Sequence, residues 1–297
     1  SNAIDLTTTA TFNDGVWHHV AVIQDGSTAR LFVDGSEITD FSTSINSGEW
    51  FDDITSASGM SIGWEGRAST ANVPFGGLLD DIAIFGRALT VDELKGLYDV
   101  AASAVYAYDV GQFNPLRAAH HQGGGASVLV DGITWSYASG LTGAAGLNGR
   151  TLVLDASAGT GFVSEGALMA HWTFDETSGQ TAVDSAGTSD GMLGPTTGID
   201  TADPTIDQPG KLGRAYRFNA GDSDVVDLSA SRSNFSAYAT GTIAGWFNTS
   251  QTPRGTLISY RDDSTNNRLI LEMLDGDDNG SLQFVVRENE RNAIHLI

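Results

Sequence analysis

Residues 14–35 read DGVWHHVAVIQDGSTARLFVDG and predict a β-hairpin. Two apolar runs, at residues 20–23 and 31–33, flank a turn at Asp25-Gly26. β-branched and aromatic residues on both sides of an Asp-Gly pair are a strong short-range hairpin signal. Because an isolated hairpin is only marginally stable in water, these strands need a larger sheet and a second sheet that faces it.

Two motifs carry a resemblance to a known family. Residues 17–22 followed by 31–35 resemble the middle of a laminin-G-like domain, which is a concanavalin A-like, pentraxin-related jelly roll. Residues 76–90 resemble the last strand of that family, and residues 91–98 its closing helix. Thr90 and Glu93 fit a capping box, in which the hydroxyl and the carboxylate satisfy free amide groups at the start of the helix. The resemblance implies an all-β jelly-roll β-sandwich.

The same family pattern returns from residue 168, now from its beginning. Residues 171–187 resemble the opening strand and turn, and residues 210–228 and 242–247 resemble the elements that follow. The halves of the fold are therefore expected in reversed order. The expected divisions are 4–100 for the C-terminal half of the sandwich, 101–167 for a small β insertion or spacer, and 168–297 for the N-terminal half.

Half a sandwich would expose a sheet-sized apolar face and open strand edges, which promotes aggregation. We therefore expect the two halves to complete each other. Within one chain they would form a circularly permuted jelly roll. Between two chains they would form a domain-swapped dimer.

Composition narrows the classes of partner. The formal net charge of −22 repels phosphate backbones, so no nucleic acid partner is expected. The chain has no cysteine, which excludes disulfides, thiolate metal sites and cysteine nucleophiles. No apolar run is long enough to span a bilayer, so membrane insertion is not expected.

Calcium is the candidate cofactor, because hard cations bind clustered oxygen ligands. Residues 275–280 imitate the start of an EF-hand loop, although Val286 stands at the twelfth position, and the alternative is a polar hairpin tip. Asp222 and Asp224 lie in a loop where carboxylates converge. Asp80 alternates with apolar residues and is expected to point inward, where either a metal ion or backbone amides would satisfy it.

A fourth calcium site is implied by the family resemblance. Pentraxins bind calcium through an Asp-Asn pair before one strand and a Glu-rich loop after another. Asn267 and Glu65 fall at those places. The sequence departs from the pattern at Asn266, where Asp is expected, and at Arg67, where a further acidic ligand is expected.

Aromatic residues in loops are the candidates for ligand binding, because sugars stack on exposed rings beside polar groups. Trp64 opens a polar loop, and Trp50 and Phe51 lie in another. These three rings are expected either to form a platform for a sugar or to belong to the core.

Catalysis is not expected. Retaining glycoside hydrolysis needs two carboxylates on one face of a strand, and the spacing of Glu272 and Asp275 places them on opposite faces. The resemblance implies instead a noncatalytic extracellular or cell-surface module for recognition or adhesion. Its expected partner is a carbohydrate or an extracellular protein, with calcium as a candidate requirement. The alternatives are a purely structural repeat of a large surface protein and, less well supported, a glycan-active enzyme.

Overall fold

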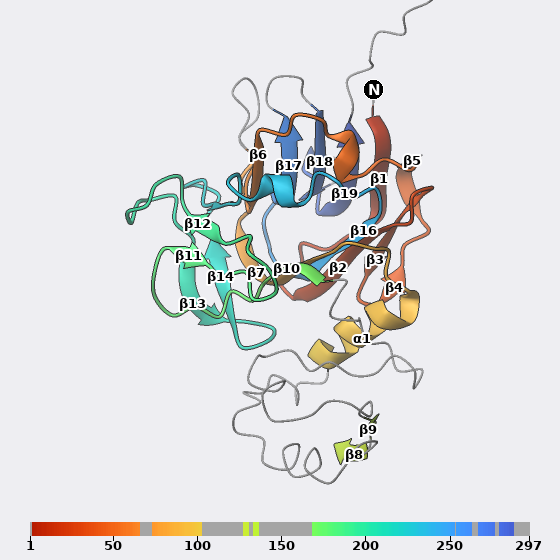
Figure 1. Cartoon of the computed structure of the whole chain (residues 1–297), viewed down its shortest axis with the longest axis horizontal. Coiled ribbons are helices and arrows are strands. Elements are labelled where there is room, and N and C mark those ends of the chain that lie inside the picture. Colours follow the sequence, from red (N-terminus) through yellow and green to blue (C-terminus); the bar gives the residue numbers. More distant parts are fainter. Residues whose placement is uncertain are drawn as a thin grey trace, which may run out of the picture. The chain divides into compact units, whose positions relative to one another are not determined.

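The computed structural model describes residues 2–65, 73–102, 127–130, 133–136, 168–252, 254–262, 267–276 and 279–287 (Figure 1). The chain divides into two compact units. Residues 1–88 and 169–297 form the first unit, and residues 89–168 form the second.

Two large antiparallel sheets make up the first unit. The first sheet contains, in spatial order, β11 (Thr181–Ala182), β12 (Gly191–Leu193), β15 (Val226–Asp227), β6 (Gly59–Ile62), β17 (Gly255–Asp262), β18 (Asn267–Met273), β19 (Ser281–Arg287), β1 (Asn2–Thr11) and β5 (Phe41–Ile45). The second contains β13 (Thr205–Pro209), β14 (Arg214–Phe218), β7 (Gly77–Phe85), β16 (Gly241–Asn248), β2 (Trp17–Gln24), β3 (Ala29–Val33) and β4 (Ser36–Glu37), with β10 (Leu168–Trp172) also paired to β7. The prediction of an all-β sandwich is confirmed.

The predicted hairpin is the β2–β3 pair. Val20 lies opposite Val33, and Gln24 lies opposite Ala29. The Asp25 carboxylate closes the turn, because its Oδ1 accepts hydrogen bonds from the backbone N–H of Ser27 at 2.8 Å and of Thr28 at 3.0 Å.

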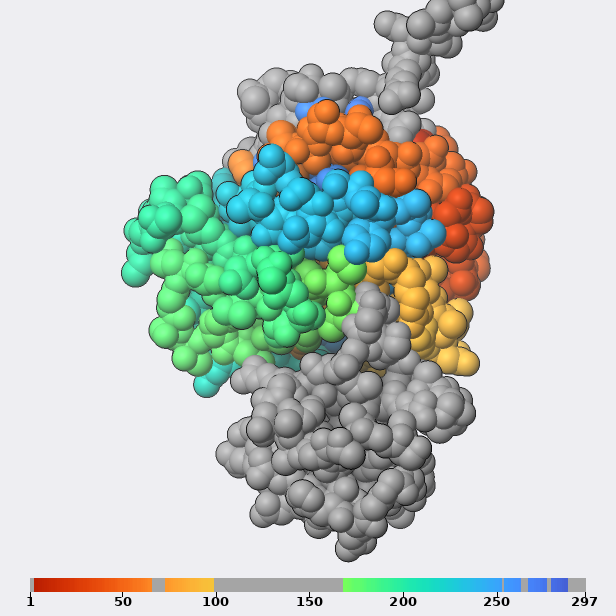
Figure 2. All heavy atoms as spheres, viewed as in Figure 1, coloured from red at the N-terminus to blue at the C-terminus, as the bar shows by residue number. Residues whose placement is uncertain are grey.

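Strands from the two distant segments of the chain alternate in both sheets. β16 lies between β7 and β2, and β17 lies between β6 and β18. β1 pairs with β19, which joins the start of the first segment to the end of the second. Figure 2 shows the same intermixing at the surface, where orange atoms of the first segment lie beside cyan atoms of the second. A backbone hydrogen bond also joins the two segments, because the Asp52 N–H donates to the Tyr238 carbonyl at 3.2 Å. The two segments complete one sandwich within this chain. The reversed order relative to the family stays a prediction.

The core fills the space between the sheets with side chains from both segments. In β18 the residues Leu269, Leu271 and Met273 face this core, and the intervening Ile270 and Glu272 face away from it, as the period of two in a strand requires. Large rings fill much of the interior: Trp50, Trp172, Phe174, Tyr216, Phe218, Phe247, Tyr260 and Phe284.

The second unit contains the helix α1 (Val91–Ala102) and a two-stranded pair of β8 (Ser127–Val130) and β9 (Ile133–Ser136). The capping box is confirmed, because the Glu93 N–H donates to Thr90 Oγ1 at 3.2 Å and the Thr90 N–H donates to Glu93 Oε2 at 2.8 Å. Among the described residues, no helix is long and apolar enough to cross a membrane.

Because both sheets are completed by hydrogen bonds within one chain, we expect the protein to be a monomer in solution. Light scattering coupled to size-exclusion chromatography, run at two protein concentrations, should give the mass of one chain at both. A dimer that persists on dilution would contradict this expectation and would favour exchange of strands between two copies.

Candidate functional site

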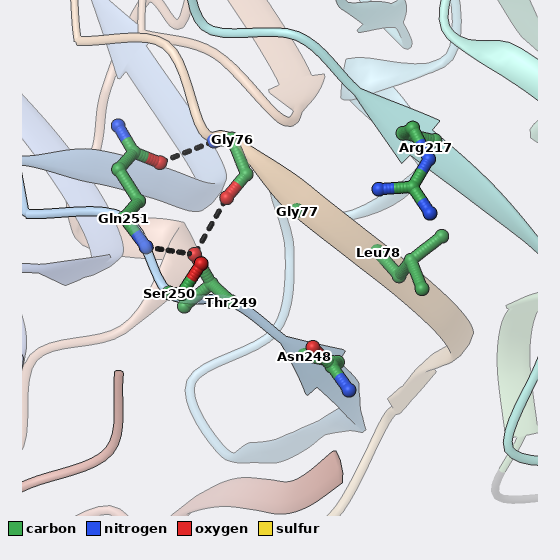
Figure 3. A pocket seen from close by; sticks show the side chains of 8 residues that line it. All are labelled: Gly76, Gly77, Leu78, Arg217, Asn248, Thr249, Ser250 and Gln251. Atoms are coloured by element: carbon green, nitrogen blue, oxygen red, sulfur yellow. Dashed lines mark hydrogen bonds between the residues drawn. The ribbon is translucent and has the colours of Figure 1, made fainter. Parts of the chain in front are cut away.

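A polar hollow of about 330 Å³ lies where β14, β7 and β16 run side by side (Figure 3). Leu78 of β7 lies opposite Arg217 of β14 on one side and Asn248 of β16 on the other. All three face away from the core, because their neighbours Leu79 and Phe247 are core residues. The complete lining is Gly76, Gly77, Leu78, Arg217, Asn248, Thr249, Ser250 and Gln251.

Hydrogen bonds hold the rim of this pocket in one shape. Thr249 Oγ1 donates to the Gly76 carbonyl at 2.5 Å, and the Gln251 N–H donates to Thr249 Oγ1 at 2.9 Å. The Gln251 side chain accepts from the Gly76 N–H and donates to the Pro74 carbonyl at 3.1 Å. Gly77 has a φ of +156°, and a Cβ there would lie 2.4 Å from the Asn248 carbonyl oxygen, so only glycine fits. The pocket is thus preformed.

Arg217 supplies an exposed positive charge to the pocket. Within the described part of the chain, its guanidinium has no hydrogen bond or ion pair, whereas Arg214 on the same strand pairs with Asp207. In a chain with a net charge of −22, an unpaired guanidinium is available to an acceptor outside the protein.

Sequence reasoning did not identify this pocket. Its lining comes from residues 76–78, 217 and 248–251, which are far apart in the chain. Only the strand order brings them together, so no local motif could have indicated them.

The structure assigns two of the three predicted ligand-binding rings to the core. Trp50 and Phe51 are fully buried and pack edge to face on each other, with Trp50 also against Phe284 and Phe51 against Tyr260. A buried ring offers no face to a sugar, so these contacts do not support a stacking role. Trp64 is half-buried, and the Arg261 guanidinium lies 5.7 Å from the centre of its ring.

Asp80 caps a backbone turn. Its Oδ2 accepts from the N–H groups of Lys211 at 2.7 Å and Leu212 at 2.9 Å. Burial, with the Asp81 charge nearby, raises the pKa of the Asp80 carboxyl well above its usual range. Of the two alternatives for this residue, the contacts support backbone capping.

Glu65 and Asn267, the residues implied by the pentraxin pattern, are both buried. Glu65 Oε1 lies 3.8 Å from Arg268 Nε, and Asn267 pairs with Asp262 across β17 and β18. The two departures from that pattern, at residues 67 and 266, lie outside the described residues.

Glu272, which is buried, forms an ion pair with Arg254, whose side chain is 33% exposed. Arg254 Nε donates to Glu272 Oε2 at 2.6 Å, and Arg254 Nη2 donates to Glu272 Oε1. Burial raises the pKa of the Glu272 carboxyl even so. Asp275 is exposed and lies beyond the end of β18, so the alternation of side chains along that strand does not apply to it.

The loop that contains Asp222 and Asp224 brings carboxylates close together. Asp224 Oδ2 accepts from the Asn219 N–H at 2.8 Å, and burial, with Asp222 and Asp203 nearby, raises the pKa of Asp224 to about 6. Asp222 is exposed and accepts from the Asn219 side-chain amide. Sequence reasoning missed Asp203, because it lies in a different loop.

The predicted metal ligands are not gathered in one place. Asp222 and Asp224 share a loop, whereas Asp80 holds a separate turn. In the ranges that the structure describes, no three or more His, Cys, Asp or Glu side chains form a group that could hold a metal ion.

A comparison with family models finds a match over the start of the chain. Residues 1–95 match the family model of the concanavalin A-like lectin/glucanases superfamily, which confirms the resemblance for this segment. Comparisons with curated proteins and with solved structures found no match.

Replacing Glu272 with Gln should lower the free energy of unfolding by roughly 1–2 kcal/mol, because the neutral side chain makes weaker hydrogen bonds to Arg254, whose guanidinium is partly exposed to solvent. The Glu272 side chain is 1% exposed. Urea unfolding measures the change. The matched control is Glu37→Gln, which breaks the exposed Arg30–Glu37 pair and should cost less than about 1 kcal/mol. Equal losses in the two variants would show that the Arg254–Glu272 pair has no special structural role.

Proposed function

We propose, on the premise that residues 1–95 belong to the concanavalin A-like lectin/glucanases superfamily, that this protein is a noncatalytic extracellular recognition module. The family suggests a module that binds carbohydrate or protein. Our proposal is that the ligand is a carbohydrate and that it binds in the pocket of Figure 3.

The observation that carries the proposal is the trio of Leu78, Arg217 and Asn248. Arg217 and Asn248 offer planar groups of N–H donors, which suit the paired hydroxyl oxygens of a sugar. Leu78, between them in the register, offers an apolar contact for the ring carbons. Pockets with a few fixed polar groups around an apolar contact are typical of small-molecule sites.

The preformed rim supports the same function. Gly76 is held by hydrogen bonds on both its N–H and its carbonyl, so a ligand would not need to order this part of the site. A site that is ordered before binding avoids part of the entropic cost of association.

The surroundings of two carboxylates, Glu272 on β18 and Asp275 beyond its end, support a noncatalytic role. Glu272 is engaged by Arg254 on both oxygens, and Asp275 stands apart from it. Neither arrangement offers the pair of carboxylates, one on each side of a glycosidic bond, that hydrolysis of glycans requires.

A purely structural repeat is the second candidate. The burial of Trp50 and Phe51 favours it, because these rings would otherwise have been the strongest indication of a sugar platform. On this alternative the pocket binds nothing, and Arg217 can be replaced without effect.

The test is a glycan array followed by calorimetric titration of the best ligand. Arg217→Gln should weaken binding by at least about tenfold, because a hydrogen bond to a charged group contributes roughly 1.5–3 kcal/mol. Arg214→Gln is the matched control, since Arg214 is exposed on the same strand, lies outside the pocket and pairs with Asp207.

The outcomes separate the candidates. Loss of binding in Arg217→Gln with retention in Arg214→Gln supports the carbohydrate site. Equal affinity in both variants would refute it, and an array without any bound glycan would favour the structural repeat or a protein ligand.

A further inference from the structure

We infer that protonation of His18 stabilises the rim of the pocket in Figure 3, so that the rim is held more firmly in mildly acidic than in alkaline solution. The inference concerns regulation of the proposed binding site, and its relevance to a ligand rests on that proposed function. The contacts that carry it lie around the start of β2 and can be measured without any ligand.

His18 lies between two carboxylates. Its Nδ1 is 2.8 Å from Asp34 Oδ2, and its Nε2 is 3.2 Å from Asp14 Oδ1. The rings of Phe12 and Phe247 pack against the imidazole, with 5.4 and 5.7 Å between ring centres. Among the described residues, the charged groups that face His18 are therefore Asp34, from the turn after β3, and Asp14, from the loop before β2.

This geometry suits the doubly protonated ring. An ionised carboxylate only accepts hydrogen bonds, and a neutral imidazole has a single N–H to donate. Neutral His18 could donate to Asp34 or to Asp14, and its other nitrogen would then present a lone pair to the second carboxylate. The imidazolium donates to both at once.

The electrostatics of the cluster agree with the geometry. The hydrogen bond to Asp34 raises the pKa of His18 above its ordinary value of 6.5, in spite of burial. Burial opposes ionisation of Asp34, but hydrogen bonds from His18 and from the His19 N–H lower the pKa of Asp34 overall. The Val16 N–H, together with His18, lowers the pKa of Asp14. Burial lowers the pKa of His19 to about 4, so His19 stays neutral where His18 titrates.

Asp14 connects His18 to the pocket. Its Oδ1 also accepts from the Val16 N–H at 3.0 Å, which closes a turn around Gly15. The Gly15 N–H donates to the Thr249 carbonyl at 2.9 Å. Thr249 lines the pocket, and its hydroxyl is part of the hydrogen-bonded rim drawn in Figure 3.

A second contact joins the same loop to the rim. Asn13 Nδ2 donates to the carbonyl of Gln251, another lining residue, at 3.2 Å. Gly280 makes room for this side chain, because it has a φ of +86° and a Cβ there would lie 2.1 Å from Asn13 Oδ1. The loop at residues 12–16 therefore has a defined position against the rim.

The sign of the pH effect follows from the raised pKa. Because His18 has a higher pKa in the folded than in the unfolded chain, its contribution to stability is complete below about pH 6.5 and is lost as the pH rises through the folded pKa. The contact to Asp14 is the longer one, and the Asp14 side chain is 58% exposed, so this contact is lost first. The turn around Gly15 then loses part of its support, and the rim loosens.

The test is an NMR titration of the ligand-free whole chain from about pH 5 to about pH 9. His18 should titrate with a midpoint above 6.5, with both ring nitrogens protonated below it. The amide resonances of Gly15 and Gln251 should shift with the same midpoint. The Ser27 amide is the internal control, because it donates to Asp25 in a similar turn and should not follow His18.

Three variants complete the test. Asp14→Asn keeps an oxygen for the Val16 N–H but removes the charge, so it should lower the His18 midpoint toward 6.5. Asp25→Asn, the same change in the control turn, should leave the midpoint unaltered. His18→Gln should abolish the pH-dependent shifts of the Gly15 and Gln251 amides.

Circular dichroism shows whether each variant is folded, and Asp14→Asn decides the test if His18→Gln is not. A His18 midpoint at or below 6.5 would overturn the inference, as would Gly15 and Gln251 amides that do not follow His18 or that still shift in His18→Gln. Since no ligand is used, a glycan array without a hit leaves this test intact, and failure here leaves the carbohydrate site to its own test.

Discussion

The backbone hydrogen bonding of β16 is the constraint on which the rest of this structure depends. β16 pairs with β7 along one edge and with β2 along the other, so a strand from the second segment of the chain lies between two strands from the first. Buried backbone amide and carbonyl groups have to be paired, and the second segment by itself supplies neither partner of β16. The candidate pocket also requires both segments, since Leu78 comes from the first and Arg217 and Asn248 come from the second.

Buried carboxylates in this structure differ in whether both of their oxygens have hydrogen-bond partners. Asp184 accepts four backbone N–H groups, three on Oδ1 from His171, Ala186 and Gly187 and one on Oδ2 from Ser189, and thereby fixes its loop. Glu272 has a guanidinium on both oxygens. Asp80 and Asp224 differ, because in the described part of the chain only one oxygen of each has a hydrogen-bond partner. The comparison separates carboxylates with both oxygens engaged from carboxylates with one oxygen engaged.

The fold was largely predictable from local chemistry, and the sites were not. The hairpin at Asp25-Gly26 and the capping box at Thr90 follow from residues close together in the chain, and both are present. For Trp50 and Phe51 the sequence left two alternatives open, a sugar platform and the core. A 3-10 turn at Phe51–Asp53, closed by the Asp53 carboxylate on the Trp50 N–H, accompanies burial of both rings in the core. The availability of Arg217 and the proximity of Asp203 to Asp224 depend on strand register and on loop contacts, which the sequence does not display.

The alternation of segments also has a consequence for the order of synthesis. Strands β1 to β7 are translated before β16, and the interval from residue 88 to residue 241 takes roughly 8–30 s at about 5–20 residues per second. During that interval β7 and β2 have no β16 between them, and the backbone N–H and C=O groups along these edges are unpaired. Open strand edges can pair with other chains, so this interval is the period in which the first segment is most exposed to aggregation.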